Sequence, residues 1–149
     1  MSPSEVRIRV LADHAALRAG LDGLSELCAQ LESGREWDIG SAVDLAQVLR
    51  VQLDEHFALE DALLSPVLRT RDSWGPVRAD SLEQHHAMQR EQLRILDAER
   101  ARAETPVSLA RAFLVLIDEL RVDMAFEERE LLTRDVLSDD FHASDGEDG

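Results

Sequence analysis

Residues 49–67 read LRVQLDEHFALEDALLSPV, and this stretch decides the fold. Its apolar residues recur alternately three and four positions apart, which is typical of a helix packed in a bundle. Two positions of the apolar face hold His56 and Glu60 instead, and a spacing of four residues makes these two side chains point the same way. The predicted core face of this helix consists of Ala46, Leu49, Leu53, His56, Glu60, Leu63 and Val67.

Three further segments show the same spacing, and polar residues again replace apolar ones at His14, His86, Asp123 and Glu127. We predict core faces made of Val10, His14, Leu17, Leu21, Leu24, Cys28 and Leu31; of Leu82, His86, Gln89, Leu93 and Leu96; and of Leu109, Phe113, Leu116, Leu120, Asp123 and Glu127.

Turn-forming residues separate the four segments. Residues 33–40 and 72–76 are rich in Gly, Ser, Asp and Pro, and the second helix is expected to end near Pro66. Thr105 reads as the N-cap of the last helix, with Pro106 at its first position. Because short connections make sequential helices antiparallel neighbours, the predicted fold is all-α, an antiparallel up-down-up-down four-helix bundle.

The polar core positions are predicted to lie at one depth. In two antiparallel helices with equal rise per residue, positions equally far from the connecting turn lie at the same depth. We take the turn centres as roughly residues 36, 71 and 105. His14 then falls level with the polar pair of the second helix, His56 with His86, and His86 with the polar pair of the fourth. Within about one helical turn, one layer therefore gathers His14, His56, Glu60, His86, Asp123 and Glu127.

Such a layer favours a metal site over its alternative, a metal-free polar core. A buried, unpaired carboxylate is costly, and di-iron and di-manganese bundles build their sites from inward His and carboxylate side chains. Oxygen and nitrogen ligands suit iron, with manganese as the second choice, whereas the absence of Cys ligands disfavours structural zinc. Nearby acids have two open interpretations, as solvated residues or as partners that orient a ligand His. They are Asp13, Glu55, Asp61 and Glu128.

Composition limits the partners and the compartment. The net charge of -15 argues against nucleic acid and anionic membranes, because both attract Lys and Arg. The single Cys28 and the lack of an apolar run of signal-peptide length favour the cytoplasm. We expect one bundle domain over residues 1–137 and an acidic, disordered tail over residues 138–149. The sequence does not predict the oligomeric state.

Four motifs in order resemble the hemerythrin-like, or HHE cation-binding, family over roughly residues 5–133. They are DHAAL at 13–17, HFALED at 56–61 followed by Leu64 and Pro66, QHH at 84–86, and DMAFEE at 123–128 followed by Leu131. The resemblance implies an up-down-up-down bundle with a non-haem di-iron centre, bridged by carboxylates and an oxygen species. Members carry or store O2, sense O2 or iron, or handle peroxide and nitric oxide.

By position, the resemblance implies nitrogen ligands at His14, His56 and His86 and bridging or chelating carboxylates at Glu60 and Glu127. No catalytic residue and no organic cofactor are predicted, and iron would be the redox centre.

Two features depart from the family. Its fourth helix normally offers His and then an acid four residues later, whereas this chain has Asp123 at the first position. An adjacent register would use Met124 and Glu128, but the apolar spacing favours Asp123 with Glu127. Oxygen carriers of the family use five His, and this bundle has at most four, of which His85 and His86 are adjacent. Adjacent helical residues point about 100° apart, so we expect only one of the two histidines to bind metal. The predicted core face of the helix contains His86, which favours His86 as the ligand.

Replacing neutral imidazole by carboxylate should stabilise the ferric state and weaken reversible O2 binding. We therefore expect a carboxylate-rich di-iron protein that reacts with O2, peroxide or NO. The alternatives are a non-enzymatic carrier or sensor of O2, NO or iron, and a centre with altered metal choice or one tight metal.

Overall fold

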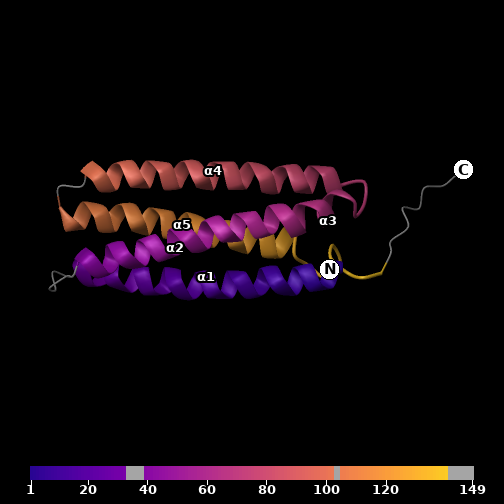
Figure 1. The fold of residues 1–149 in the computed structure, drawn as a ribbon, viewed down its shortest axis with the longest axis horizontal. Helices are drawn as coiled ribbons and strands as arrows, with labels where there is room; N and C mark the ends of the chain where they lie inside the picture. Colours follow the sequence, from indigo (N-terminus) through magenta and orange to yellow (C-terminus); the bar gives the residue numbers. More distant parts are fainter. Residues whose placement is uncertain (33–38, 103–104, 141–149) are drawn as a thin grey trace, which may run out of the picture.

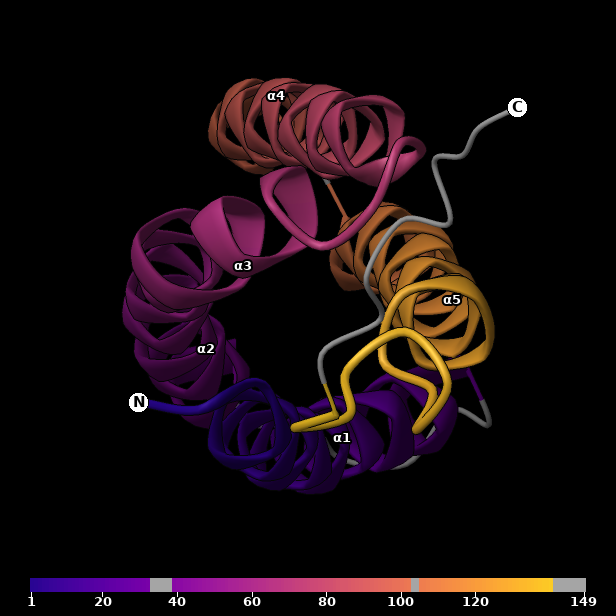
Figure 2. The ribbon, with the colours of Figure 1, turned by 90° about the vertical axis from the view of Figure 1, so that its right-hand side faces the viewer.

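A computed structural model describes residues 1–32, 39–102 and 105–140. All regular structure in these ranges is helical, as predicted. The elements are α1 (Pro3–Glu32), α2 (Ile39–Leu59), the π-helical turn η1 (Glu60–Leu64), α3 (Ser65–Arg69), α4 (Gly75–Arg102) and α5 (Pro106–Glu130). α2, η1 and α3 follow one another without a break, so the described residues form four long rods: α1, the α2–η1–α3 run, α4 and α5. These rods lie side by side in Figure 1. Figure 2 looks along these rods and shows them around a common axis.

Local sequence fixes where two of the helices begin. Ser2 and Glu5 form a capping box at the start of α1, because Glu5 Oε2 accepts from the Ser2 backbone N–H at 2.7 Å and Ser2 Oγ accepts from the Glu5 backbone N–H at 3.3 Å. Thr105 caps α5 as predicted, since its hydroxyl accepts from the Ser108 backbone N–H at 3.2 Å and Pro106 follows it.

Two apolar clusters form the core, and a buried polar layer lies between them. Along α1 the order is Val10 of one cluster, His14, and Leu17 of the other. The same order, apolar then polar then apolar, recurs in the other rods. The buried polar residues are His14, His56, Glu60, Ser65, His86, Gln89 and Glu127. The predicted apolar positions of α1 and α4 are all buried, including Cys28.

The second rod departs from the prediction after Glu60. Leu63 and Val67 are only partly buried, whereas Leu64 and Leu68 are fully buried. The cause is the turn η1, in which the Ser65 backbone N–H donates to the carbonyl of Glu60, five residues back. This wider turn shifts the inward face by one residue, and single π turns of this kind are frequent at functional sites. The rod also continues beyond Pro66, to Arg69.

The fifth helix ends close to the polar layer. The carbonyl of Glu127 accepts from the backbone N–H groups of both Leu131 and Leu132, at 2.8 and 2.9 Å. After this point, Ser138 Oγ accepts from Arg71 Nη2 at 2.7 Å, and Asp139 Oδ2 accepts from Ser4 Oγ at 2.6 Å. Residues 141–149 of the predicted tail lie outside the described residues, so the tail stays a prediction.

Within the described ranges, no helix combines the length and the apolar character that a bilayer-spanning helix requires.

Candidate metal centre

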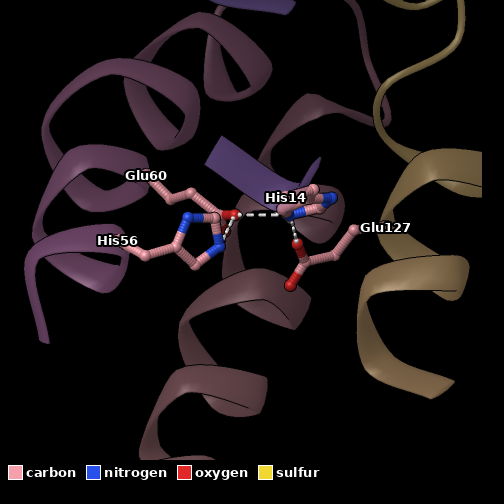
Figure 3. Close-up of side chains that lie close together, drawn as sticks. All are labelled: His14, His56, Glu60 and Glu127. Atoms are coloured by element: carbon pink, nitrogen blue, oxygen red, sulfur yellow. Dashed lines mark hydrogen bonds and ion pairs between the residues drawn. The ribbon is translucent and has the colours of Figure 1, made fainter. Parts of the chain in front are cut away.

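Four side chains from three rods meet in the polar layer. His14 comes from α1, His56 and Glu60 from the second rod, and Glu127 from α5 (Figure 3). One nitrogen or oxygen atom of each lies within 4.8 Å of one atom of every other, and all four side chains are buried. His and carboxylate donors at this spacing can surround one cation.

Glu60 joins these residues to His86 on α4. Its Oε1 lies 2.5 Å from His56 Nε2 and 3.2 Å from His14 Nε2, whereas its Oε2 lies 2.9 Å from His86 Nε2. Figure 3 shows the Glu60 carboxylate between His56 and His14. One fully buried carboxylate thus faces histidines on three rods, and its two oxygens serve different histidines.

The opposite nitrogen of each histidine meets a second carboxylate. His14 Nδ1 donates to Glu128 Oε2 at 2.8 Å, His56 Nδ1 to Asp13 Oδ2 at 3.0 Å, and His86 Nδ1 to Asp61 Oδ1 at 2.7 Å. These bonds hold all three Nε2 atoms toward the centre, as in metal sites where an acid orients the ligand His. Of the two interpretations left open, the structure supports the orienting one for Asp13, Asp61 and Glu128. Glu55 is exposed, which agrees with the solvated interpretation.

Two arginines that sequence reasoning missed hold these acids. Arg18 Nη1 lies 2.6 Å from Glu128 Oε2, and Arg90 Nη2 lies 3.3 Å from Asp61 Oδ2. Each arginine follows a core histidine of its own helix by four residues, so the pair could have been found by that spacing.

Electrostatics tie the histidines to Glu60. Burial alone would lower the pKa of His14, but its interactions with Glu127 and Glu60 outweigh burial and raise the pKa to about 10. Burial opposes protonation of His56 and His86 too, yet Glu60 raises the pKa of both. For Glu60 the balance is reversed, because its three histidines overcome burial and hold its pKa well below the ordinary value.

Glu127 is the least satisfied member of the layer. Burial and repulsion from Glu60 raise its pKa to about 7 despite the opposing effect of His14. Its Oε2 lies 3.1 Å from His14 Nε2 but makes no well-directed hydrogen bond with any described residue. A buried carboxylate oxygen left without a partner needs an explanation, and a cation would supply one.

Asp123 lies apart from the four-residue cluster. It is partly buried, whereas Met124 takes the fully buried position next to it. Its Oδ2 accepts from Gln89 Nε2 at 2.8 Å, and Gln89 Oε1 is buried without a hydrogen bond to the described residues. The structure therefore brings five of the six predicted residues together through Glu60 and leaves Asp123 bonded to Gln89.

The adjacent histidines of α4 face different surroundings. His86 is 1 % exposed and contacts Glu60. His85 packs edge-on against Phe126, with ring centroids 5.0 Å apart, and lines a groove of about 280 Å³ that Asp123 also lines.

This difference predicts which histidine holds metal. His86→Ala should lose at least about half of the bound iron, because it removes a nitrogen that faces Glu60. His85→Ala, its matched control one residue away, should keep iron near the parental level. Elemental analysis of both purified variants provides the measurement. Greater loss in the His85 variant would reverse the assignment.

No curated protein and no solved structure is significantly similar to this chain. Residues 9–134 match the hemerythrin HHE cation binding domain. This range contains the His/Glu layer and most of the chain, so the chain belongs to the hemerythrin HHE cation-binding domain family.

Proposed function

We propose that this protein is a non-haem di-iron protein whose carboxylate-rich centre reacts with O2, peroxide or NO. The observation that carries the proposal is Glu60, a fully buried carboxylate whose two oxygens face histidines of three different rods. The proposal takes the fold as the antiparallel up-down-up-down bundle, in agreement with the path of the chain in Figure 1. It also places the protein in the cytoplasm, for which the single cysteine is the argument.

The residues present fit iron. All the donors are imidazole nitrogens and carboxylate oxygens, which suit iron and, as the second choice, manganese. Glu127 Oε2 is buried without a hydrogen-bond partner among the described residues, as expected of an atom meant for a cation. Bound iron would supply a change of redox state and a binding position for a small molecule.

We propose two unequal metal positions. Glu60 Oε1 faces the first position, where His14, His56 and Glu127 add three donors. Glu60 Oε2 faces the second position, where His86 is the histidine donor. Asp123 would complete the second position by turning from Gln89, and we therefore propose that this position binds its ion more weakly.

The surrounding residues define what the centre can do. The acids behind the three histidines fix the rings and add negative charge, which favours the oxidised metal. Asp123, which would complete the second position, also lines the groove beside His85. This arrangement favours consumption of the ligand over reversible carriage.

Turnover separates the proposal from a carrier or sensor. The reduced, iron-loaded protein would be mixed with O2, peroxide or NO while ligand concentration and optical spectrum are followed. We expect net consumption of at least one ligand beyond one equivalent when a reductant is supplied. A spectrum that forms and reverses with ligand pressure, without consumption, would assign the protein to the carriers.

Metal uptake should be coupled to proton release. A pKa of about 10 keeps His14 protonated in the metal-free protein at neutral pH, and Glu60 also raises the pKa of His56 and His86. A metal requires the neutral Nε2 of each histidine. Binding of Fe(II) should therefore release protons and tighten by at least about tenfold between about pH 6 and 8. Anaerobic titration in a weakly buffered pH indicator measures both quantities.

Stability of the metal-free protein provides a second readout. The pKa of His14 rises from 6.5 to about 10 on folding, so its stabilising contribution is complete below 6.5 and disappears as the pH rises toward 10. The free energy of unfolding of the metal-free protein should fall over this range. Metal uptake without proton release, together with a pH-independent affinity, would contradict the arrangement.

A further inference from the structure

The half of the bundle beyond the metal centre holds a cavity of about 690 Å³, which the proposed function does not use. All four rods line it, and most of the lining side chains are leucines or other apolar residues. Leu53 lies three residues before His56, and Leu93 lies four residues after Gln89. Both line the cavity, which therefore begins next to the polar layer. A space of this size is within the range of sites for small organic ligands.

Leucine side chains cannot hydrogen-bond to water. Water against the leucine part of the lining would lack polar partners, and an empty space there would forfeit packing contacts. An apolar ligand would relieve both problems, so the cavity is suited to a hydrocarbon chain.

The charged residues that line the cavity identify the other end of the ligand. Arg50 of α2 and Arg100 of α4 are basic, and Asp97 of α4 is the acid among the lining residues. The whole chain has 16 basic against 31 acidic residues, so this lining reverses the general charge balance. Arg100 makes no ion pair with any residue in the described part of the chain. Such a pair of arginines attracts an anionic group.

One ion pair crosses from α2 to α4 among these charged residues. Arg50 Nη1 lies 2.7 Å from Asp97 Oδ2, and Asp54 also lies 3.7 Å from Arg50 Nε. Arg50 and Asp97 are 37 % and 49 % exposed, and exposed pairs of this kind contribute little to stability. Arg50 Nε is nevertheless buried and without a hydrogen-bond partner among the described residues. A ligand carboxylate can therefore take the place of Asp97 on Arg50.

We propose that this cavity binds an anionic amphiphile of the fatty-acid type, with its hydrocarbon chain among the leucines and its carboxylate on Arg50 and Arg100. The site shares no residue with the metal centre, so it is independent of the proposed function. Asp97 acts as the internal competitor of the ligand carboxylate.

Calorimetric titration with decanoate and with the cationic decyltrimethylammonium tests the proposal, because the two probes share a chain and differ in charge. Decanoate should bind at least about tenfold more tightly. Its affinity should be the same in the iron-loaded and the chelator-treated protein. Equal binding of the two probes, or no binding of decanoate, would overturn the proposal.

Charge variants locate the head group. Arg50→Gln and Arg100→Gln should each weaken decanoate binding by about fivefold or more, whereas Arg94→Gln, on α4 outside the cavity, should not. Asp97→Asn should strengthen decanoate binding, because it removes the competitor. Unchanged affinity in all three cavity variants would remove the assignment of the head group.

A variant that fills the cavity tests where the hydrocarbon chain of the ligand binds. Ala46 lines the cavity, so Ala46→Phe should abolish decanoate binding, whereas Ala19→Phe, at an exposed position of α1, should leave it unchanged. Light scattering of the same samples should show an unchanged molar mass. The proposal would be overturned if the parental protein is a dimer that binds no decanoate and Ala46→Phe makes it monomeric. The cavity would then be a surface for self-association.

Discussion

Replacing Glu60 by alanine should remove nearly all metal from the protein. Among the residues that the structure describes, Glu60 is the one carboxylate that faces His14, His56 and His86 together, and both proposed metal positions depend on it. Its loss also removes the buried negative charge that the three histidines share and that would attract a cation. We expect iron affinity to fall by more than about a hundredfold, beyond the loss typical of residues that only orient a ligand.

Two further variants separate metal binding from folding. Glu60→Gln keeps the size of the side chain but removes the charge, and it should also lose most of the iron. Glu55→Ala removes an exposed acid from the same helix and should keep the parental iron content. Circular dichroism should show that all three variants remain helical. Parental iron content in folded Glu60→Ala would rule out the proposed centre.

Replacing Asp123 should remove one ion and leave the other. His14, His56, Glu60 and Glu127 surround the first position without Asp123. The second position depends on His86 and on an acid that the structure shows bonded to Gln89. Asp123→Asn and Asp123→Ala should therefore lower the iron content from about two ions to about one. Asp123→His should keep both ions, raise the reduction potential and make reversible O2 binding easier to observe.

The matched control for this experiment is Asp118→Asn. Asp118 lies on the same helix, is exposed and lines the same groove as Asp123, so its replacement should not change the iron content. If Asp123 only orients other groups, its asparagine variant should keep both ions and change the spectrum or the reactivity alone. Full iron occupancy in both Asp123→Asn and Asp123→Ala would show that Asp123 is not a ligand.

Sequence spacing was enough to predict the polar layer, because regular helices repeat every 3.6 residues and short turns set their relative depth. His14, His56, Glu60, His86 and Glu127 all fall at buried positions. The apolar spacing of α1 and α4 was predictable for the same reason. The inward faces of these two helices are not interrupted by a π turn, so each inward position can be predicted from the one before it.

Spacing failed where the backbone leaves the regular repeat or where side-chain orientation decides. Because of the π turn that begins at Glu60, Leu64 is buried in place of Leu63. A prediction that assumes 3.6 residues per turn throughout cannot anticipate this wider turn. The Asp123 side chain was expected in the layer, but the structure shows it bonded to Gln89. Asp123 as a ligand therefore stays a prediction that the metal analyses decide.

Iron content per chain tests the central claim most directly. The protein would be purified, loaded anaerobically with Fe(II), freed of unbound metal and analysed for metals and protein in the same sample. A buried layer with two metal positions around Glu60 predicts close to two iron ions per chain. No more than traces of iron, manganese or any other transition metal in a folded sample would contradict the account, because the layer would then be a metal-free polar core.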